Sequence, residues 1–245
     1  MGTDFKRIII KNNSDENLIG DYYDRNTEHV VLIVHGSRCS RKSSPGSQIT
    51  RKLKESISVY AFDLSGNGES QGELEDATYS KEVEDIHTVV TYFQKIGKKV
   101  ILIGHSKGAT ETIIYLKKYP NTILTYILLA PRIELKKSQE YVKYQDHKED
   151  VESQGYFMYN PTQKVTKEFL KDIEQYDDLT KYKEKIETKG MLIHGVADEI
   201  IHITQADHFA PNANIILKKI PEANHSFTEH IDEVIKLIEV CFLNF

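Results

Sequence analysis

The chain lacks the residues and spacings that build metal sites and disulfide frameworks. Its 245 residues include no tryptophan and two cysteines, Cys39 and Cys241, which lie near opposite ends. No Cys-x-x-Cys or His-Glu-x-x-His spacing occurs, and these are the spacings of structural zinc sites and of zinc proteases. We therefore expect no metal site and two free thiols in a reducing compartment, which indicates a cytoplasmic location.

An excess of basic charge and long apolar runs are also absent. The formal net charge is -5, which argues against a nucleic-acid partner because phosphate binding needs a basic face. No apolar run approaches the length of a membrane-spanning helix, and residues 1–6 lack the apolar core of a signal peptide. With 39% hydrophobic and 28% charged residues, the composition is that of one globular domain, residues 1–245.

What the chain does contain is an alternation of short apolar runs and helical periods. Val83, Ile86, Val90 and Phe93 recur at helical intervals, and residues 231–242 carry one apolar stripe. Strands are expected at residues 7–10, 18–23, 30–34, 58–62, 100–103, 125–129, 190–193 and 214–220. This alternation predicts an α/β fold with a mostly parallel central sheet and helices on both faces.

Residues 131–189 interrupt the alternation. The segment is rich in charged residues and tyrosine and contains no convincing strand, whereas residues 166–175 and 178–186 have a helical pattern. A long insertion in a compact domain is usually functional or disordered, and the many aromatic side chains argue against disorder. We expect a small helical cap over the strand ends, with an ordinary peripheral excursion as the alternative.

The most informative motif is Gly104-His105-Ser106-Lys107-Gly108, which lies between an apolar run and a helical stretch. A G-x-S-x-G turn between a strand and a helix is the nucleophile elbow, in which the serine hydroxyl is exposed at the top of a sheet. Serine needs a base to become nucleophilic, and the base needs an orienting carboxylate. The motif therefore directs the search to an acid and a histidine later in the chain.

Two loops after expected strands supply these partners. Asp198 follows the run at residues 190–193, and His225 follows the run that ends at Ile220. Because reacting groups gather at the carboxyl edge of open α/β sheets, both side chains are expected beside Ser106. Glu199 is the rival acid, with Asp207 too far into the following helix. The rival base is His230, which lies inside the last helix.

The oxyanion hole requires two backbone N–H groups, one from the residue after the nucleophile and one from the loop after an early strand. These are Lys107 and Ser37, with Arg38 as the alternative to Ser37. His35 is expected to brace that loop, and His105 to pack beneath the elbow. Residues 62–70, which contain Gly66 and Gly68, read as a tight structural turn rather than a phosphate loop.

Together, the runs Val34-His35-Gly36, Phe62 to Ser70, Gly104 to Gly108, His194 to Asp198 and Asn224-His225 resemble the α/β-hydrolase superfamily. Within it the chain is most similar to cinnamoyl or feruloyl esterase-like and serine aminopeptidase-like hydrolases. The resemblance implies a cytosolic serine hydrolase that uses no cofactor, forms an acyl-enzyme and has an acyl pocket shaped by the segment at residues 131–189.

The chain also departs from this pattern. Ser37-Arg38-Cys39 stands where relatives carry a bulky apolar residue, and Asn224 replaces a common aspartate. Lys107 stands where glutamine or methionine is frequent; it would either bias the site toward negatively charged or polar groups or lie on the helix surface. The resemblance leaves two hypotheses: a hydrolase of small acyl esters, with thioesters or amides next, or a small-molecule receptor.

Overall fold

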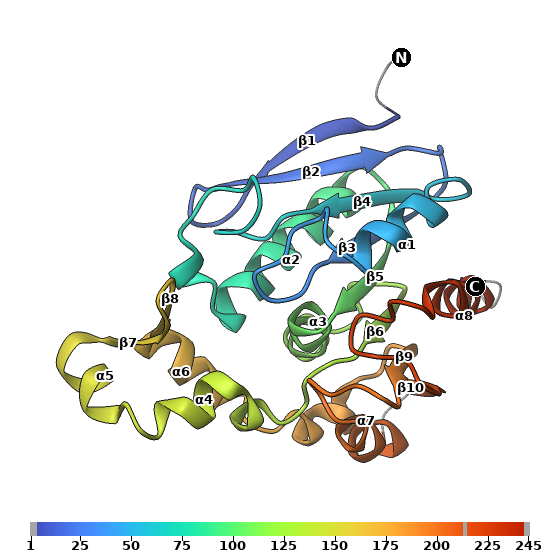
Figure 1. Ribbon diagram of the computed structural model, residues 1–245. Coiled ribbons are helices and arrows are strands. Elements are labelled where there is room, and N and C mark those ends of the chain that lie inside the picture. The colour runs from blue at the N-terminus through green and yellow to red at the C-terminus, as the bar shows by residue number, and fades with distance from the viewer. Residues whose placement is uncertain (1–3, 213–214, 243–245) are drawn as a thin grey trace.

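An eight-stranded sheet forms the centre of the computed structural model, which describes residues 4–212 and 215–242 (Figure 1). The strands follow the order β1, β2, β4, β3, β5, β6, β9, β10. Their bounds are β1 Lys6–Lys11, β2 Asn17–Tyr23, β3 His29–Val34, β4 Ser58–Phe62, β5 Lys99–His105, β6 Thr125–Leu129, β9 Gly190–Gly195 and β10 Ile215–Ile220. The β1–β2 and β2–β4 pairs are antiparallel and the others parallel, so the predicted mostly parallel sheet is confirmed.

All eight predicted strands are present, with bounds that shift by one or two residues. The expected start of the last strand, Asn214, lies outside the described residues, and β10 is described from Ile215. The parallel strands at the centre are buried along nearly their whole length, which is why their sequences read as continuous apolar runs.

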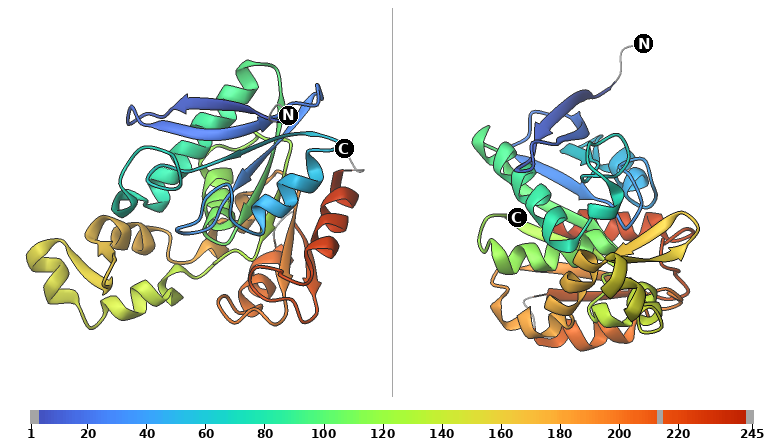
Figure 2. Two further views of the ribbon diagram at one scale, coloured as in Figure 1. Left: turned by 45° about the horizontal axis from the view of Figure 1, so that its top comes forward. Right: turned by 90° about the vertical axis from the view of Figure 1, so that its left-hand side faces the viewer.

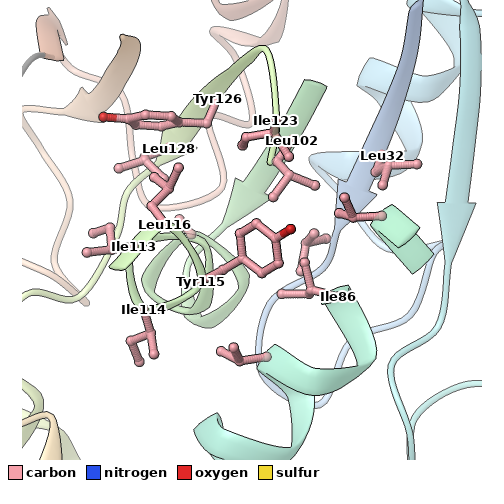
Figure 3. Packing of buried hydrophobic residues seen from close by; sticks show 14 of the residues in the cluster. Leu32, Ile86, Leu102, Ile113, Ile114, Tyr115, Leu116, Ile123, Tyr126 and Leu128 are labelled. Carbon is pink, nitrogen blue, oxygen red and sulfur yellow. The ribbon is translucent and has the colours of Figure 1, made fainter. Parts of the chain in front are cut away.

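Helices cover both faces of this sheet (Figure 2). They are α1 Gly46–Leu53, α2 Tyr79–Lys95, α3 Lys107–Lys118, α7 Thr204–Phe209 and α8 Ile231–Phe242, with 3₁₀ turns at Leu74–Asp76 and Ala210–Asn212. Because neighbouring residues of a strand face opposite sides, Leu102 packs with α2 and α3, whereas Ile101 and Ile103 pack with α1 and α8. Figure 3 shows the first of these layers, where Tyr115 of α3 and Ile86 of α2 are buried together.

The segment at residues 131–189 lies at one end of the molecule, joined to the body through β6 and β9 (Figures 1 and 2). It contains a 3₁₀ turn at Leu135–Lys137, helices α4 Gln139–Tyr144, α5 Lys148–Gln154 and α6 Lys167–Gln175, and a second 3₁₀ turn at Leu179–Lys185. The helix expected at residues 166–175 is thus confirmed, and the one at 178–186 is a 3₁₀ helix.

The expectation that residues 131–189 contain no strand was wrong. Strands β7 Tyr156–Asn160 and β8 Gln163–Thr166 form an antiparallel hairpin. The hairpin forms because Phe157 and Val165 pair across it and turn inward, where they pack with Val151 and Leu170 in a small separate core. The cap is therefore mixed rather than purely helical.

Candidate active site

Ser106 lies in a sharp turn between the end of β5 and the start of α3. Its backbone has φ 54° and ψ -118°, a conformation that residues with a side chain rarely adopt. Two glycines make the turn possible: a Cβ on Gly104 would lie 2.5 Å from the Gly108 carbonyl oxygen, and one on Gly108 would lie 2.5 Å from the His35 carbonyl oxygen. The backbone N–H of Ser106 donates to Leu129 of the next strand at 2.8 Å, which fixes the turn at the sheet edge.

The structure brings Ser106, His225 and Asp198 into one line of hydrogen bonds. His225 Nε2 lies 2.9 Å from Ser106 Oγ, and His225 Nδ1 lies 2.8 Å from Asp198 Oδ2. A carboxylate accepts and does not donate, so Nδ1 carries the proton and donates to Asp198. Nε2 is then unprotonated, and its lone pair faces the hydroxyl of Ser106. The three residues follow β5, β9 and β10, so neighbouring parts of the sheet place them on the same edge.

The loop after β9 holds Asp198 in one orientation. Its Oδ1 accepts hydrogen bonds from the backbone N–H groups of Ile200 and Ile201 at 2.9 and 2.8 Å. The buried His194 places its Nε2 3.2 Å from Asp198 Oδ2. Burial alone would raise the pKa of Asp198, but the hydrogen bonds from His194, His225 and Ile201 hold that pKa well below its ordinary value. Asp198 is therefore an ionised acceptor at neutral pH.

The rival residues lie elsewhere. Glu199 is exposed, and Asp207 on α7 forms an ion pair with Lys219 at 2.6 Å. His230 lies at the start of α8, where its carbonyl oxygen accepts from the Val234 backbone. None of these three takes part in the hydrogen bonds that join Ser106, His225 and Asp198 in the described chain.

His105 has a contact that the sequence did not reveal. Its Nε2 donates to the backbone oxygen of His225 at 3.0 Å, and the two imidazole rings are 5.0 Å apart. Burial and the neighbouring His225 lower the pKa of His105 to about 4, so its ring is neutral near pH 7. It packs beneath the elbow, as expected, and also holds the loop that carries His225.

The loop after β3 lies directly against the nucleophile turn. A Cβ on Gly36 would lie 3.2 Å from Ser106 Cβ, so Ser37 follows a point of very close approach. Lys107 is the first residue of α3, and a first-turn N–H has no partner within its helix. Arg38 adopts a left-handed conformation, φ 55°, immediately beyond Ser37. Lys107 is thus the chain neighbour of Ser106, and Ser37 and Arg38 directly follow the close approach of Gly36.

A buried ionic cluster braces that loop against the turn at residues 62–70. Arg41, almost fully buried, contacts Asp63, Asp21 and Glu69, and its backbone N–H also donates to Asp63 at 2.7 Å. His35 Nε2 accepts from the Leu64 backbone at 3.1 Å, so the expected bracing role of His35 is confirmed. Sequence reasoning missed Arg41, because its acidic partners Asp21, Asp63 and Glu69 lie 20, 22 and 28 residues away in the sequence.

The Lys107 side chain is buried, so the expectation that it might lie on the helix surface was wrong. Its Nζ donates to the Ala77 carbonyl oxygen at 2.8 Å, forms an ion pair with Glu82 of α2, and lies 3.1 Å from Glu111 Oε1. The ammonium also lies 5.1 Å from the centre of the Tyr79 ring. The tertiary partners, rather than the helix position, decide where this side chain goes.

Two hollows lie beside the hydrogen-bonded side chains: Lys107, the neighbour of Ser106, lines one of them, and His225 lines the other. The first, here called the oxyanion-side pocket, is lined by Ser37, Arg38, Asn67, Leu74, Glu75, Ala77, Glu82, Lys107, Glu140, Gln163, Lys164, Val165, Thr166 and Phe169. The second, the His225 groove, is a shallower hollow lined by Ala197, Glu199, Ile200, Asn224, His225, Ser226 and Thr228. The cap supplies one wall of the first pocket, from Glu140 and the segment around the hairpin and α6.

Comparison with known proteins places this geometry in a family. Residues 25–154, more than half of the chain, match the family Hydrolase_4, described as serine aminopeptidase, S33. The chain belongs to this S33 hydrolase family. Among curated proteins, it is 25% identical over 240 residues to a monoglyceride lipase homolog of Monkeypox virus, an alignment that covers 85% of this chain and 86% of the viral protein. It is also 27% identical over 106 residues to protein phosphatase methylesterase 1 of Candida albicans, covering 42% of this chain and 29% of that protein.

Solved structures of hydrolases share the fold of this S33 family member. The esterase Est1E from Butyrivibrio proteoclasticus, determined with ferulic acid, has a TM-score of 0.82 at 19% identity and covers 97% of this chain and 98% of its own. The mouse alpha/beta hydrolase domain-containing protein 10 has a TM-score of 0.77 at 17% identity, covering 98% and 99%. The predicted α/β-hydrolase fold is therefore confirmed.

No helix within residues 4–212 and 215–242 is long and apolar enough to cross a bilayer. No group of three or more histidine, cysteine or acidic side chains in these ranges is arranged to hold a metal ion.

Proposed function

We propose that this protein is a serine hydrolase that cleaves a small carboxylic ester with Ser106, His225 and Asp198 as its catalytic residues. The observation that carries the proposal is the unbroken line of hydrogen bonds from Ser106 Oγ through His225 to the carboxylate of Asp198, at 2.9 and 2.8 Å. These are the distances at which a base can take a proton and an acid can orient that base.

In the proposed reaction, His225 Nε2 removes the proton from Ser106 Oγ as the oxygen attacks the acyl carbonyl. Asp198 holds the Nδ1 proton and stabilises the imidazolium that forms. The backbone N–H groups of Ser37 and Lys107 stabilise the oxyanion, an interaction worth roughly 2.7–4 kcal/mol per donor. The imidazolium then protonates the leaving alcohol, and water attacks the acyl-enzyme by the same route to release the acid.

The two hollows fit the two halves of such a substrate. The leaving group must accept its proton from His225, so it belongs in the His225 groove. The N–H groups of Ser37 and Lys107 hold the carbonyl oxygen of the attacked carbon, and the acyl chain on the same carbon is then assigned to the other hollow, the oxyanion-side pocket, which begins at these two residues. The esterase and lipase-like names among the similar proteins favour an ester over a thioester or an amide.

A fluorophosphonate label and a short p-nitrophenyl ester test this proposal together. We expect the wild-type chain to gain one covalent adduct and to hydrolyse the ester, and Ser106→Ala to do neither. Ser14→Ala is the matched control, because that serine is exposed in the turn between β1 and β2 and lines neither hollow. Equal activity in the wild type and Ser106→Ala would contradict the proposal.

The receptor hypothesis gives a different pattern. It predicts very slow turnover together with ligand-dependent protection of the cap amides in hydrogen exchange. Rapid turnover by the wild type would exclude a purely receptor function.

A further inference from the structure

The oxyanion-side pocket is unusually small and polar for an acyl site. Its volume is about 40 Å³, which is room for roughly three water molecules. Most of its lining side chains are polar or charged, whereas ligand pockets are generally lined by apolar and aromatic groups. A pocket of this size and character cannot receive a long hydrocarbon chain without rearrangement.

One side chain forms the floor where a longer acyl group would continue. Lys107 follows Ser106 directly, lines the pocket and is buried. Its ammonium donates to the Ala77 carbonyl and to the carboxylate of Glu82, and forms an ion pair with Glu111 at 3.1 Å. The aromatic rings of Tyr79 and Phe169 flank the ammonium at 5.1 and 6.0 Å. These contacts hold the end of the side chain on several sides.

The charges around Lys107 hold it in place. Glu82 also accepts from Asn67, another pocket residue, at 3.1 Å. Burial and the negative charge of Glu82 raise the pKa of Glu111 well above its usual value, whereas Lys107 lowers the pKa of Glu82. Displacing Lys107 would leave Glu82 buried without its counter-charge, which is strongly unfavourable. An apolar chain placed against the ion pair would gain no compensating contact.

We infer that Lys107, held by Glu82, Glu111 and Ala77, limits the acyl pocket to short acyl groups of up to about four carbons. The inference rests on the proposed function and narrows it: the substrates are esters of small carboxylic acids. Lys107 is then a specificity-determining residue as well as the source of a backbone N–H for the oxyanion.

Chain-length selectivity tests the inference. We compare kcat/KM for p-nitrophenyl acetate, butyrate and octanoate in the wild type and in Lys107→Met combined with Glu82→Gln, which removes both charges together. We expect the wild type to favour acetate and butyrate, and the double variant to shift the octanoate-to-acetate ratio at least about tenfold toward octanoate, because pocket contacts with one methylene already discriminate 10- to 200-fold. A ratio that does not move overturns the inference, as does a wild type that prefers octanoate.

The matched control is Lys118→Met combined with Glu84→Gln. Lys118 also lies on α3 and pairs with a glutamate of α2, at 2.7 Å, but this pair is exposed and lies outside the pocket. We expect the ratio to stay at its wild-type value. If the Lys107 double variant fails to fold, Phe169→Ala removes another lining side chain of the pocket while keeping both charges of the ion pair, and should shift the ratio in the same direction. An unchanged ratio there also counts against the inference.

A binding measurement separates this inference from the proposed function. In Ser106→Ala, which cannot form an acyl-enzyme, butyrate should raise the melting temperature and octanoate should not. Adding Lys107→Met and Glu82→Gln should allow octanoate to do so. Octanoate binding equally well to Ser106→Ala overturns the chain-length limit even if the protein hydrolyses no ester, whereas inactivity toward every ester overturns only the proposed function.

Discussion

The sheet and the cap of this protein differ in how much apolar surface they bury and in what they contribute to the site. The sheet is covered on both faces by extensive apolar clusters, and its edge holds Ser106, His225 and Asp198 in contact. Part of the cap packs into the large cluster, through residues such as Ile173, Tyr176 and Leu179, and hydrogen bonds between Ser80 and Asp172 also join it to α2. Its outer part, with α5 and the β7–β8 hairpin, packs around a small separate cluster of Val151, Phe157, Val165 and Leu170. A densely packed frame, the sheet and its covering helices, thus carries the reacting groups, and the more lightly packed outer part of the cap contributes a wall of the pocket.

This contrast indicates how the two parts would vary. A nucleophile line needs positions fixed to a fraction of an ångström, which dense packing supplies. A substrate pocket needs adjustable walls, and segments with few buried contacts open at low cost. Changes in the frame should therefore alter rate or global stability, and changes in the cap should alter which substrate is accepted.

The largest effect should come from the frame, at Asp198→Asn. The asparagine amide has a single oxygen, which cannot accept both from His225 Nδ1 and from the backbone N–H groups of Ile200 and Ile201. The tautomer of His225 with its proton on Nδ1 would therefore no longer be favoured. We expect kcat to fall roughly 10⁴-fold with little change in KM. Steady-state kinetics measure this, and circular dichroism checks the fold. Glu199→Gln, one residue away and exposed, should leave kcat near its wild-type value; a similar loss there would move the acid to Glu199.

A second comparison sets one buried leucine of each region against the other. Leu102→Ala in β5 removes a fully buried side chain between α2 and α3 and should lower the free energy of unfolding by about 2–5 kcal/mol. Leu170→Ala in α6 removes an almost equally buried side chain, but from the small cap cluster.

For Leu170→Ala we expect a much smaller change in global unfolding by urea, with loss of hydrogen-exchange protection confined to the cap. Equal global destabilisation by the two variants would show that the cap and the sheet unfold as one unit, which would contradict the separate opening of the cap.

The same division separates what the sequence could and could not predict. The strands of the frame could be predicted because burial on both faces requires continuous apolar runs, such as residues 30–34. The two glycines of the elbow indicate a close turn. The hairpin at β7 and β8 was missed because its buried positions are few and lie between exposed or half-buried ones: Phe157 in β7, and Gln163 and Val165 in β8. Helix α1 was not predicted either, because its run is largely polar.

Within the site, residues that follow strand ends were predictable, and residues that act through distant partners were not. Ser106, Asp198 and His225 each follow an apolar run, so chain order alone points to them. Nothing local marks Lys107 as buried: its acceptor Glu82 lies 25 residues earlier on another helix. Arg41 is similar, since only the fold brings Asp63 and Asp21 to it.

The pH dependence of stability offers a third test of the frame. Burial and the neighbouring His225 lower the pKa of His105 from 6.5 to about 4, so the unfolded chain binds more protons than the folded one between these values. Stability should therefore fall as pH drops from about 6.5 toward 4, by roughly 3 kcal/mol in total from this residue. Urea unfolding at pH 7 and pH 4.5 measures the change.

Substitution of His105 measures how much of the loss of stability at low pH comes from this residue. In His105→Gln the loss between pH 7 and 4.5 should be smaller than in the wild type, because the group that must stay neutral is gone. His147→Gln is the counterpart in the cap, where the ring is partly exposed and contacts Asp150. His147→Gln should lose as much stability between pH 7 and 4.5 as the wild type. A smaller loss in His147→Gln, with a wild-type loss in His105→Gln, would contradict the assignment of the effect to His105.

The smallest expected effect concerns the attachment of the cap to the frame. Asp172 of α6 accepts hydrogen bonds from the backbone N–H and the hydroxyl of Ser80, at 2.6 and 2.8 Å, at the N-terminal end of α2. A carboxylate there accepts from a backbone N–H of the first helical turn and interacts favourably with the helix dipole. Together these interactions stabilise the contact by about 1–2 kcal/mol. Asp172→Ala should therefore loosen α6 around the Phe169 side chain that lines the pocket, while the hydrogen bonds from Ser106 to Asp198 stay intact.

For an enzyme with the proposed activity, Asp172→Ala should change KM and the acyl-chain preference more than kcat for p-nitrophenyl acetate. Kinetics on acetate and octanoate esters measure both quantities. Glu168→Ala is the control on the same helix, because this exposed carboxylate contacts only Lys171, at 3.8 Å, among the ion pairs of the described chain. If Asp172→Ala instead lowers kcat with no change in KM or preference, the cap contributes to the chemistry itself, and the division between a rate-setting frame and a substrate-selecting cap does not hold.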